Sequence, residues 1–246
     1  MERDLDILMR EFIQENSEKS DDEKQQPDYN YDFYEEERSI SEGSPFASLL
    51  SRINGYGCWC YLDGDHKNAG GPVQDGMDAY CKNMILGYRC MNLDSDEVVG
   101  DPLSNTFPLS NPDSATGECS IDTVEYNSGI GGTADPIEIA CEKRNVGNNC
   151  AINACKIENN FVKKILRDLF TGNLDSNLGH DAGFNPATSC VNPEAPNRGR
   201  ECCGVYPSRF QFGTGDGKRK CCFDKTFDAT TGLQCCPDGQ ILSSCA

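Results

Sequence analysis

Residues 56–88, YGCWCYLDGDHKNAGGPVQDGMDAYCKNMILGY, decide how the central part of the chain folds. Two cysteines flank Trp59 at the start, a glycine-rich acidic segment follows, and residues 75–92 then predict a helix. The strongest helical pattern lies further on, over residues 148–171, where apolar side chains form one stripe. Residues 93–137 are rich in Gly, Pro, Asn and Asp, which predicts loops and at most a small hairpin. We therefore expect two long helices joined by a loop-rich segment.

Cysteine content limits both the kind of protein and its compartment. The chain has 16 cysteines in 246 residues, several of them adjacent. Zinc sites need spaced Cys and His pairs, and His66 and His180 do not stand in such an array, so a disulfide framework is expected. Disulfides persist in oxidising surroundings, which predicts a secreted, extracellular protein. The residues after Met1 have no apolar core and are not a signal peptide, so we expect a processed chain or mature numbering.

The net charge of −18 excludes some partners and favours others. Nucleic acids and anionic membrane surfaces are disfavoured, whereas calcium, a basic partner or a mineral surface suits the charge. Residues 1–43 hold fifteen acidic and five basic residues. This acidic arm is either a solvated linker or a docking segment whose aromatic and apolar side chains contact a partner. The candidate contact residues are Leu5, Leu8 and Phe12, which have helical spacing, and Tyr31, Phe33 and Tyr34.

Residues 201–246 form a separate cysteine-rich module, preceded by a linker over residues 192–200. So short a segment needs disulfides, because its apolar core alone is too small. Its seven cysteines are odd in number, so either Cys190 belongs to the module or one disulfide joins the module to the main domain. Both alternatives predict rigid attachment. The module cysteines are Cys202, Cys203, Cys221, Cys222, Cys235, Cys236 and Cys245.

A small basic group lies in the same module. Lys218, Arg219 and Lys220 follow a glycine-rich turn. They are either a solvated turn or the place where the acidic arm of another copy binds.

The stretch at residues 56–88 resembles the secreted phospholipase A2 family over about 40 residues. In that family a Y-G-C-x-C-G-x-G-G loop binds calcium, and P-x-D-x-x-D-x-C-C-x-x-H-D-x-C-Y follows on a helix. The resemblance implies a mainly α, disulfide-rich fold in which two antiparallel helices pack beside a calcium-loop-like segment, over residues 44–191. The matching positions are residues 56–60, Pro72, Asp75, Asp78, Cys81 and Tyr88.

The resemblance also indicates that the family's chemistry is lost. Its reaction needs a histidine as general base, an aspartate that orients it, and a second aspartate that holds Ca²⁺. Met84 and Ile85 stand at the histidine and calcium-aspartate positions, and neither can take a proton or bind calcium. Lys156 falls at the orienting position, or Glu158 if the register shifts. We therefore expect no enzyme activity.

Calcium has one weak alternative site. Asp63 and Asp65 could supply two oxygens to Ca²⁺, but the glycine and distal Glu of an EF-hand are missing, and the alternative is a polar turn. His66, beside these acids on the same glycine-rich loop, is expected at the surface.

The family's disulfides imply two pairings. Cys60–Cys81 joins the loop to the first helix. Gly87 occupies a family cysteine position, and Cys90 lies one helical turn further along the same face, so Cys90 is expected to bond Cys155 in its place.

Three functions follow from these observations. The first is an inactive structural protein of an extracellular matrix, coat, filament or mineral that assembles with itself or with matrix proteins. The second is a secreted binding protein or inactive toxin-complex subunit, with an apolar groove at Met84 and Ile85, although core packing explains these two side chains better. The third is a calcium-dependent lipid hydrolase that uses His66 or His180, which stands beside Asp181.

Overall fold

A computed structural model describes residues 52–62, 64, 66–96, 112–113, 117–127, 137–170, 174–191 and 200–245. The acidic-arm residues Leu5, Leu8, Phe12, Tyr31, Phe33 and Tyr34, and the calcium candidates Asp63 and Asp65, lie outside these ranges. The helical elements are η1 (His66–Asn68), α3 (Gly76–Asp96), α4 (Ile137–Arg144), α5 (Asn149–Phe170), η2 (Ser176–Leu178), α6 (Pro186–Ser189) and η3 (Ala229–Thr231). The strands are β1 (Arg200–Cys203), β2 (Phe210–Gly213), β3 (Arg219–Cys222), β4 (Lys225–Asp228), β5 (Gln234–Cys235) and β6 (Ile241–Leu242).

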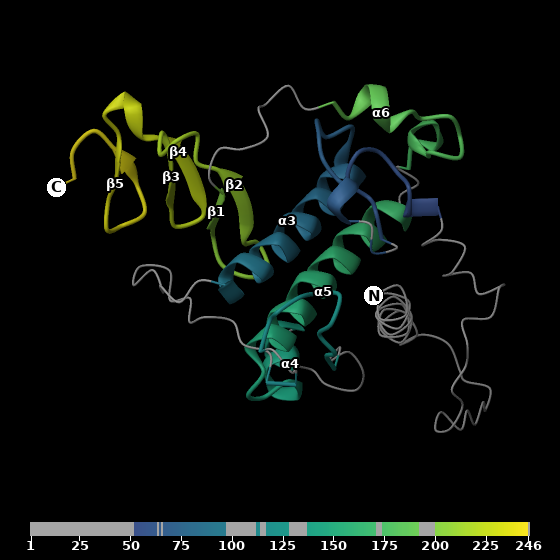
Figure 1. Cartoon of the computed structure of the whole chain (residues 1–246), viewed down its shortest axis with the longest axis horizontal. Helices are drawn as coiled ribbons and strands as arrows, with labels where there is room; N and C mark the ends of the chain where they lie inside the picture. Colours follow the sequence, from purple (N-terminus) through teal and green to yellow (C-terminus); the bar gives the residue numbers. More distant parts are fainter. Residues whose placement is uncertain are drawn as a thin grey trace, which may run out of the picture.

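Helices α3 and α5 lie side by side and antiparallel at the centre of the molecule (Figure 1). Both were predicted from apolar spacing, and both are confirmed. On α5 the predicted stripe faces the core, where Ala151, Ala154, Ile157, Phe161 and Ile165 are all buried. Burying each large apolar side chain contributes roughly 1.5–3 kcal/mol, so this shared face is the main source of stability in the helical part.

Helix α4 was not predicted, because it is short and has no apolar stripe. It packs on α5 and is joined to it by the Cys141–Cys155 disulfide. A second disulfide, Cys119–Cys150, ties the segment at residues 117–127 to the start of α5. Both α4 and the segment at residues 117–127 are therefore covalently attached to α5, and α4 also packs on it.

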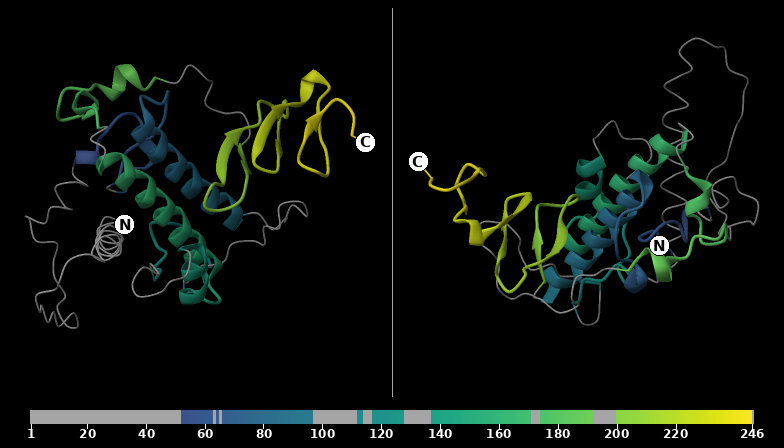
Figure 2. Two further views of the ribbon diagram at one scale, coloured as in Figure 1. Left: turned by 180° about the vertical axis from the view of Figure 1, so that it is seen from behind. Right: turned by 90° about the horizontal axis from the view of Figure 1, so that it is seen from above.

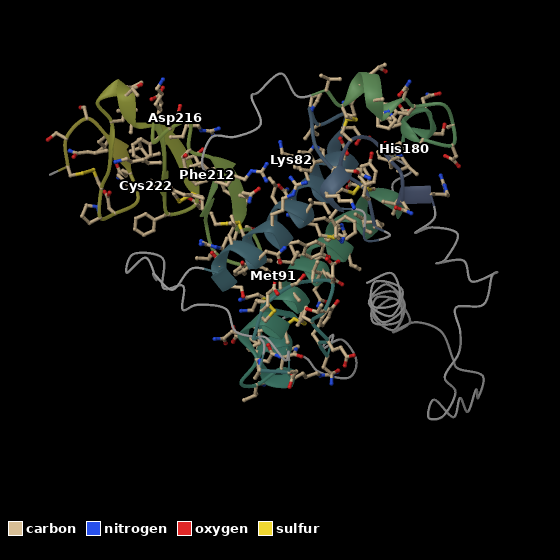
Figure 3. The ribbon with its side chains drawn as sticks, viewed as in Figure 1. Lys82, Met91, His180, Phe212, Asp216 and Cys222 are labelled. Carbon is tan, nitrogen blue, oxygen red and sulfur yellow. A yellow bond between two sulfur atoms is a disulfide. The ribbon has the colours of Figure 1, made fainter. Side chains whose placement is uncertain are left out.

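The C-terminal module is a row of three antiparallel hairpins, β1–β2, β3–β4 and β5–β6, that extends away from α3 (Figures 1 and 2). Two disulfides connect successive hairpins, because the second cysteine of an adjacent pair bonds a cysteine of the next hairpin: Cys203–Cys221 and Cys222–Cys235. A third, Cys236–Cys245, closes the last hairpin. Figure 3 shows side chains along this row, with Phe212, Asp216 and Cys222 labelled.

The fold-class prediction is confirmed only in part. The molecule is rich in disulfides, with eight, and two long helices dominate its centre. The described residues also contain three small sheets, so "mainly α" does not cover the whole chain. No helix in the described part is long and apolar enough to cross a membrane.

Of the two predicted disulfides, Cys60–Cys81 is confirmed and Cys90–Cys155 is wrong. Cys90 bonds Cys202 instead, and Cys155 bonds Cys141. The physical reason is the placement of two elements that the prediction lacked: the module packs on α3 at Cys90, and α4 packs on α5 at Cys155.

The odd cysteine count in the module is also explained. One disulfide, Cys90–Cys202, joins the module to the main domain, while Cys190 pairs with Cys58 inside that domain. This was one of the two alternatives left open, and the rigid attachment that both implied is present.

Candidate functional site

The positions that the resemblance assigns to the catalytic base and the calcium ligand lie on α3, facing α5. Met84 is 2% exposed and Ile85 is fully buried. The cavity beside Met84, lined also by Tyr80, Ile157 and Phe161, has a volume of only about 10 Å³. A space of that size holds at most one water molecule, so these side chains pack the core and line no channel.

The two candidates for the orienting position, Glu158 and Lys156, have different surroundings. The carboxylate of Glu158 is fully buried and accepts hydrogen bonds from two phenols, Tyr88 (2.9 Å) and Tyr126. The ammonium of Lys156 lies 2.6 Å from Glu142 of α4. Both oxygens of Glu158 are thus hydrogen-bonded, where a buried carboxylate without partners would be costly. Tyr88 lies one helical turn from Met84, so this carboxylate binds phenols close to Met84.

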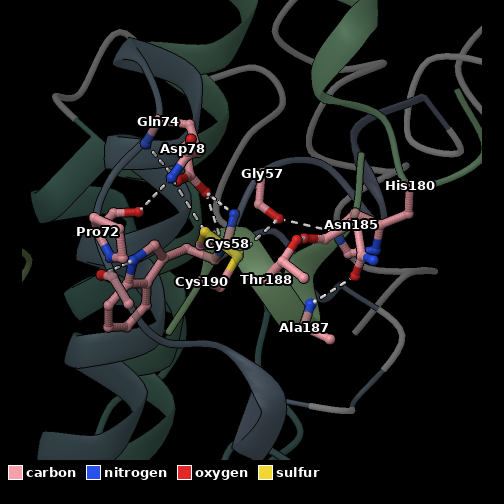
Figure 4. Close-up of a disulfide and its surroundings, with 12 residues drawn as sticks. Gly57, Cys58, Pro72, Gln74, Asp78, His180, Asn185, Ala187, Thr188 and Cys190 are labelled. Atoms are coloured by element: carbon pink, nitrogen blue, oxygen red, sulfur yellow. Dashed lines mark hydrogen bonds between the residues drawn. A yellow bond between two sulfur atoms is a disulfide. The ribbon is translucent and has the colours of Figure 1, made fainter. Parts of the chain in front are cut away.

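Neither histidine provides a base at this site. His180 donates from Nε2 to the carbonyl oxygen of Gly57 at 2.8 Å and stacks on Phe184, so it pins two loops together (Figure 4). The ring of His66 packs against Tyr88, with centroids 5.3 Å apart, and this contact is aromatic. The prediction that His66 lies at the surface is therefore wrong, because its ring is half-buried against Tyr88.

Both halves of the motif that carries the resemblance come together in space. Asp78, fully buried on α3, accepts the backbone N–H groups of Cys58 (3.0 Å), Trp59 (2.8 Å) and Gln74 (2.9 Å) (Figure 4). Burial raises the pKa of Asp78, and these three donors counteract that rise only in part. The carboxylate therefore holds the loop onto the helix, and Gly57 is needed beside it. Gly57 has φ +58°, and a Cβ there would lie 2.6 Å from the Asp78 carboxyl carbon.

The loop that precedes α3 is held by cations of the helix. Arg89 donates to the carbonyl oxygens of His66 (3.0 Å) and Ala69 (2.7 Å). Arg89 and Lys82 also lie 5.5 and 5.2 Å from the ring centre of Trp59, which is 6% exposed. Cation–π contacts of this kind contribute about 0.5–2 kcal/mol each. The loop is thus ordered by side chains of α3 itself, and within the described residues no cluster of three or more His, Cys, Asp or Glu could hold a metal.

A second polar centre, missed by sequence reasoning, lies where the module meets α3. Arg209 donates twice to Asp94, from Nε at 2.7 Å and from Nη2 at 2.8 Å, and once to the carbonyl oxygen of Gly204 at 2.7 Å. Tyr206 adds a third donor to Asp94 at 2.8 Å. Both charged groups are 6% exposed. We call Asp94, Tyr206 and Arg209 the buried latch. Asp94 lies one helical turn beyond Cys90, so the disulfide and the ion pair attach the module to the same part of α3.

The basic residues of the module lie at its surface. Lys218, Arg219 and Lys220 are exposed around the start of β3, and Arg219 donates to Thr226 at 2.6 Å on the neighbouring strand. The structure brings them together with Lys225 on one hairpin and leaves them apart from Met84 and Glu158. They therefore belong to a different part of the molecule from Met84 and Glu158.

No family model, no curated protein and no solved structure matches this chain.

Proposed function

We propose that this chain is a secreted, catalytically inactive building block of an extracellular assembly, on a phospholipase A2-like scaffold. The observation that carries the proposal is the burial of Met84 and Ile85 beside a cavity of about 10 Å³. A reaction site needs a base, a place for the substrate and access from solvent. Buried side chains at Met84 and Ile85 leave room for none of the three, and this supports the proposal.

The durability of the framework supports a structural role. Eight disulfides join parts of the chain that are between 9 and 132 residues apart. Such density suits an oxidising, extracellular setting. The module is fixed to α3 by a disulfide and a buried ion pair, so the molecule presents its surfaces in one arrangement. A rigid body of this kind favours repeated, specific contacts, because little ordering entropy is lost on assembly.

The two other functions have less support. A lipid-binding protein needs a channel for the acyl chain, and the cavity beside Met84 has room for one water. A hydrolase needs a base beside its substrate, and His180 is engaged by Gly57 while His66 packs on Tyr88. Assembly needs neither channel nor base.

Two measurements on the full chain test the proposal. Light scattering after size exclusion, with calcium and with chelator, should give masses above the 27.0 kDa of one chain that rise with protein concentration. Hydrolysis of micellar phospholipid, with an active secreted phospholipase A2 as positive control, should stay at the rate without protein in both conditions. Calcium-dependent hydrolysis, or a monomer at every concentration, would contradict the proposal.

A further inference from the structure

Phe223 occupies an unusual backbone position at the tip of the second hairpin. It is the first residue of the two-residue turn between Cys222 and Lys225, which pair across β3 and β4. Its φ is +56°, a left-handed conformation that hairpin turns normally give to Gly or Asn and that strains a bulky aromatic residue. One edge of the ring lies against Gly239 of the third hairpin and the Phe223 carbonyl accepts from Gly204 (2.8 Å), but the side chain stays 56% exposed, so burial alone does not explain a phenylalanine there. Strained residues held at the surface point to function.

Cations accompany this aromatic ring. In the β3–β4 register Cys222 is opposite Lys225, and Lys220 lies two residues before Cys222 on the same strand. Alternation along a strand therefore places Lys220 and Lys225 on one face of the hairpin, with Phe223 at its end. Both lysines are exposed. We name Lys220, Phe223 and Lys225 the basic aromatic tip.

Three acids lie near these groups. Asp228 lies on the opposite face, across from Arg219, and its carboxylate caps Thr230. Asp224 is the second residue of the turn, and Asp238 adjoins Gly239, whose Cβ position is 3.3 Å from the Phe223 ring. On a larger scale, residues 200–245 contain six basic and five acidic residues, while the rest of the chain carries −19. An acidic segment is therefore repelled less by the module than by the rest of this acidic protein.

The chain itself contains a segment of matching chemistry. Residues 28–37, DYNYDFYEEE, hold five acids and four aromatic residues and no base. Aromatic side chains supply contact area on an exposed ring, and carboxylates pair with lysines at the edge of the contact. We propose that the basic aromatic tip of one copy binds residues 28–37 of a second copy. This inference rests on the proposed function, since it names the contact through which the building block assembles.

A second copy is favoured over the same chain by the shape of the molecule. The first described segment of the chain, drawn in dark blue, lies at the opposite end of the molecule from the β3–β4 hairpin (Figures 1 and 2). Docking within one chain would stretch residues 38–51 along the length of α3. Docking between copies needs no such path, and it links molecules head to tail, so that the contact repeats.

The test compares self-association of full-length variants by sedimentation velocity, together with their melting temperatures. Phe223→Gly removes the ring and also the backbone strain, so the melting temperature should stay within a few degrees of wild type or rise. Self-association should weaken about tenfold or more, as for loss of an interface anchor. K220E/K225E should weaken it similarly. Two matched controls should leave association unchanged. V146G replaces an 81% exposed valine between α4 and α5, and K163E replaces an exposed lysine on α5.

A charge exchange identifies the occupant. E35K/E36K/E37K should fail to associate alone, and mixing it with K220E/K225E should restore complexes between the two. A labelled synthetic peptide of residues 28–37 should bind wild type and lose affinity for the F223G chain about tenfold or more. Wild-type association that none of these variants changes would overturn this inference and leave the proposed function standing. A chain that stays monomeric while the peptide still binds only the intact tip would overturn docking between copies and self-assembly together.

Discussion

Removing Arg209 tests whether the buried latch fixes the module. In Arg209→Met the Asp94 carboxylate loses two of its three donors and keeps Tyr206. The pair is 6% exposed on each side, so water cannot replace the lost donors without opening the contact. Breaking a buried ion pair by removing one partner costs about 3–5 kcal/mol, because a buried charge is left behind. We expect a loss at the lower end of that range, since Tyr206 remains.

A double variant also removes the Asp94 charge that Arg209→Met leaves without its partner. In Asp94→Asn/Arg209→Met the amide oxygen still accepts from Tyr206, and no ion is buried. The double variant should therefore recover at least about 2 kcal/mol relative to Arg209→Met alone. Arg219→Met is the control, because Arg219 is an exposed arginine of the same module whose bond to Thr226 lies at the surface. Its loss should change stability by less than about 0.5 kcal/mol.

The assay is urea unfolding with all disulfides intact, followed by near-ultraviolet circular dichroism, together with hydrogen exchange of the β1 and β2 amides. Exchange in the first hairpin should accelerate in Arg209→Met, although Cys90–Cys202 still tethers it. A cost below about 1 kcal/mol, or exchange rates equal to wild type, would refute the reasoning, because it would mean that the disulfide alone holds the module.

Three further predictions concern the loop and the module junction. Gly57→Ala should cost about 2–5 kcal/mol in urea unfolding, because φ is +58° and the new methyl group meets Asp78 at 2.6 Å; Gly70→Ala, with nothing within 4 Å, is the control. Asp78→Asn should cost about 1–3 kcal/mol, because its amide N–H₂ opposes a backbone donor. Since burial raises the folded-state pKa of Asp78, the native state binds the proton more readily than the unfolded state. Wild type should therefore gain stability relative to Asp78→Asn as pH falls from 7 toward 4. A difference in the free energy of unfolding between the two proteins that becomes smaller as pH falls would contradict this direction. Cys90→Ser/Cys202→Ser opens a loop of 112 residues and should lower the free energy of unfolding by up to about 5 kcal/mol, while equal urea midpoints would show that the latch suffices.

The helices could be predicted because their signal is local. The α5 stripe repeats within the helix itself, and residues three or four apart share a face whatever the rest of the chain does. The contact of Asp78 with the loop was not predicted, because Asp78 and Cys58 are 20 residues apart and the motif gave only the positions of the two residues. The short helix α4 escaped because eight residues without a stripe carry no such pattern.

The contacts that could not be predicted from the sequence are those between distant segments. Cys90 and Cys202 are 112 residues apart, and the partner of Asp94 is 115 residues away, so no spacing rule connects them. One signal was nevertheless present in the sequence. Because the module has seven cysteines, either one of them bonds a cysteine of the main domain or an eighth cysteine belongs to the module. Placing that bond on α3 would have displaced the Cys90–Cys155 pairing and freed Cys155 for α4. The wrong pairing thus came from carrying over a family bridge while ignoring the odd count.

The surroundings of Met84 and of Phe223 differ in what they contribute to stability. Met84 and Ile85 are buried apolar side chains, and Glu158 accepts hydrogen bonds from two phenols and so avoids a bare buried charge. On the proposed scaffold these side chains would stand where a catalytic base and a calcium ligand are kept next to solvent at a cost in stability. Phe223 departs in the opposite sense, since a strained and exposed aromatic residue lowers stability where glycine would raise it. Strain at the module tip therefore marks a surface where another requirement outweighs stability, and that is where the contacts of this protein should be sought.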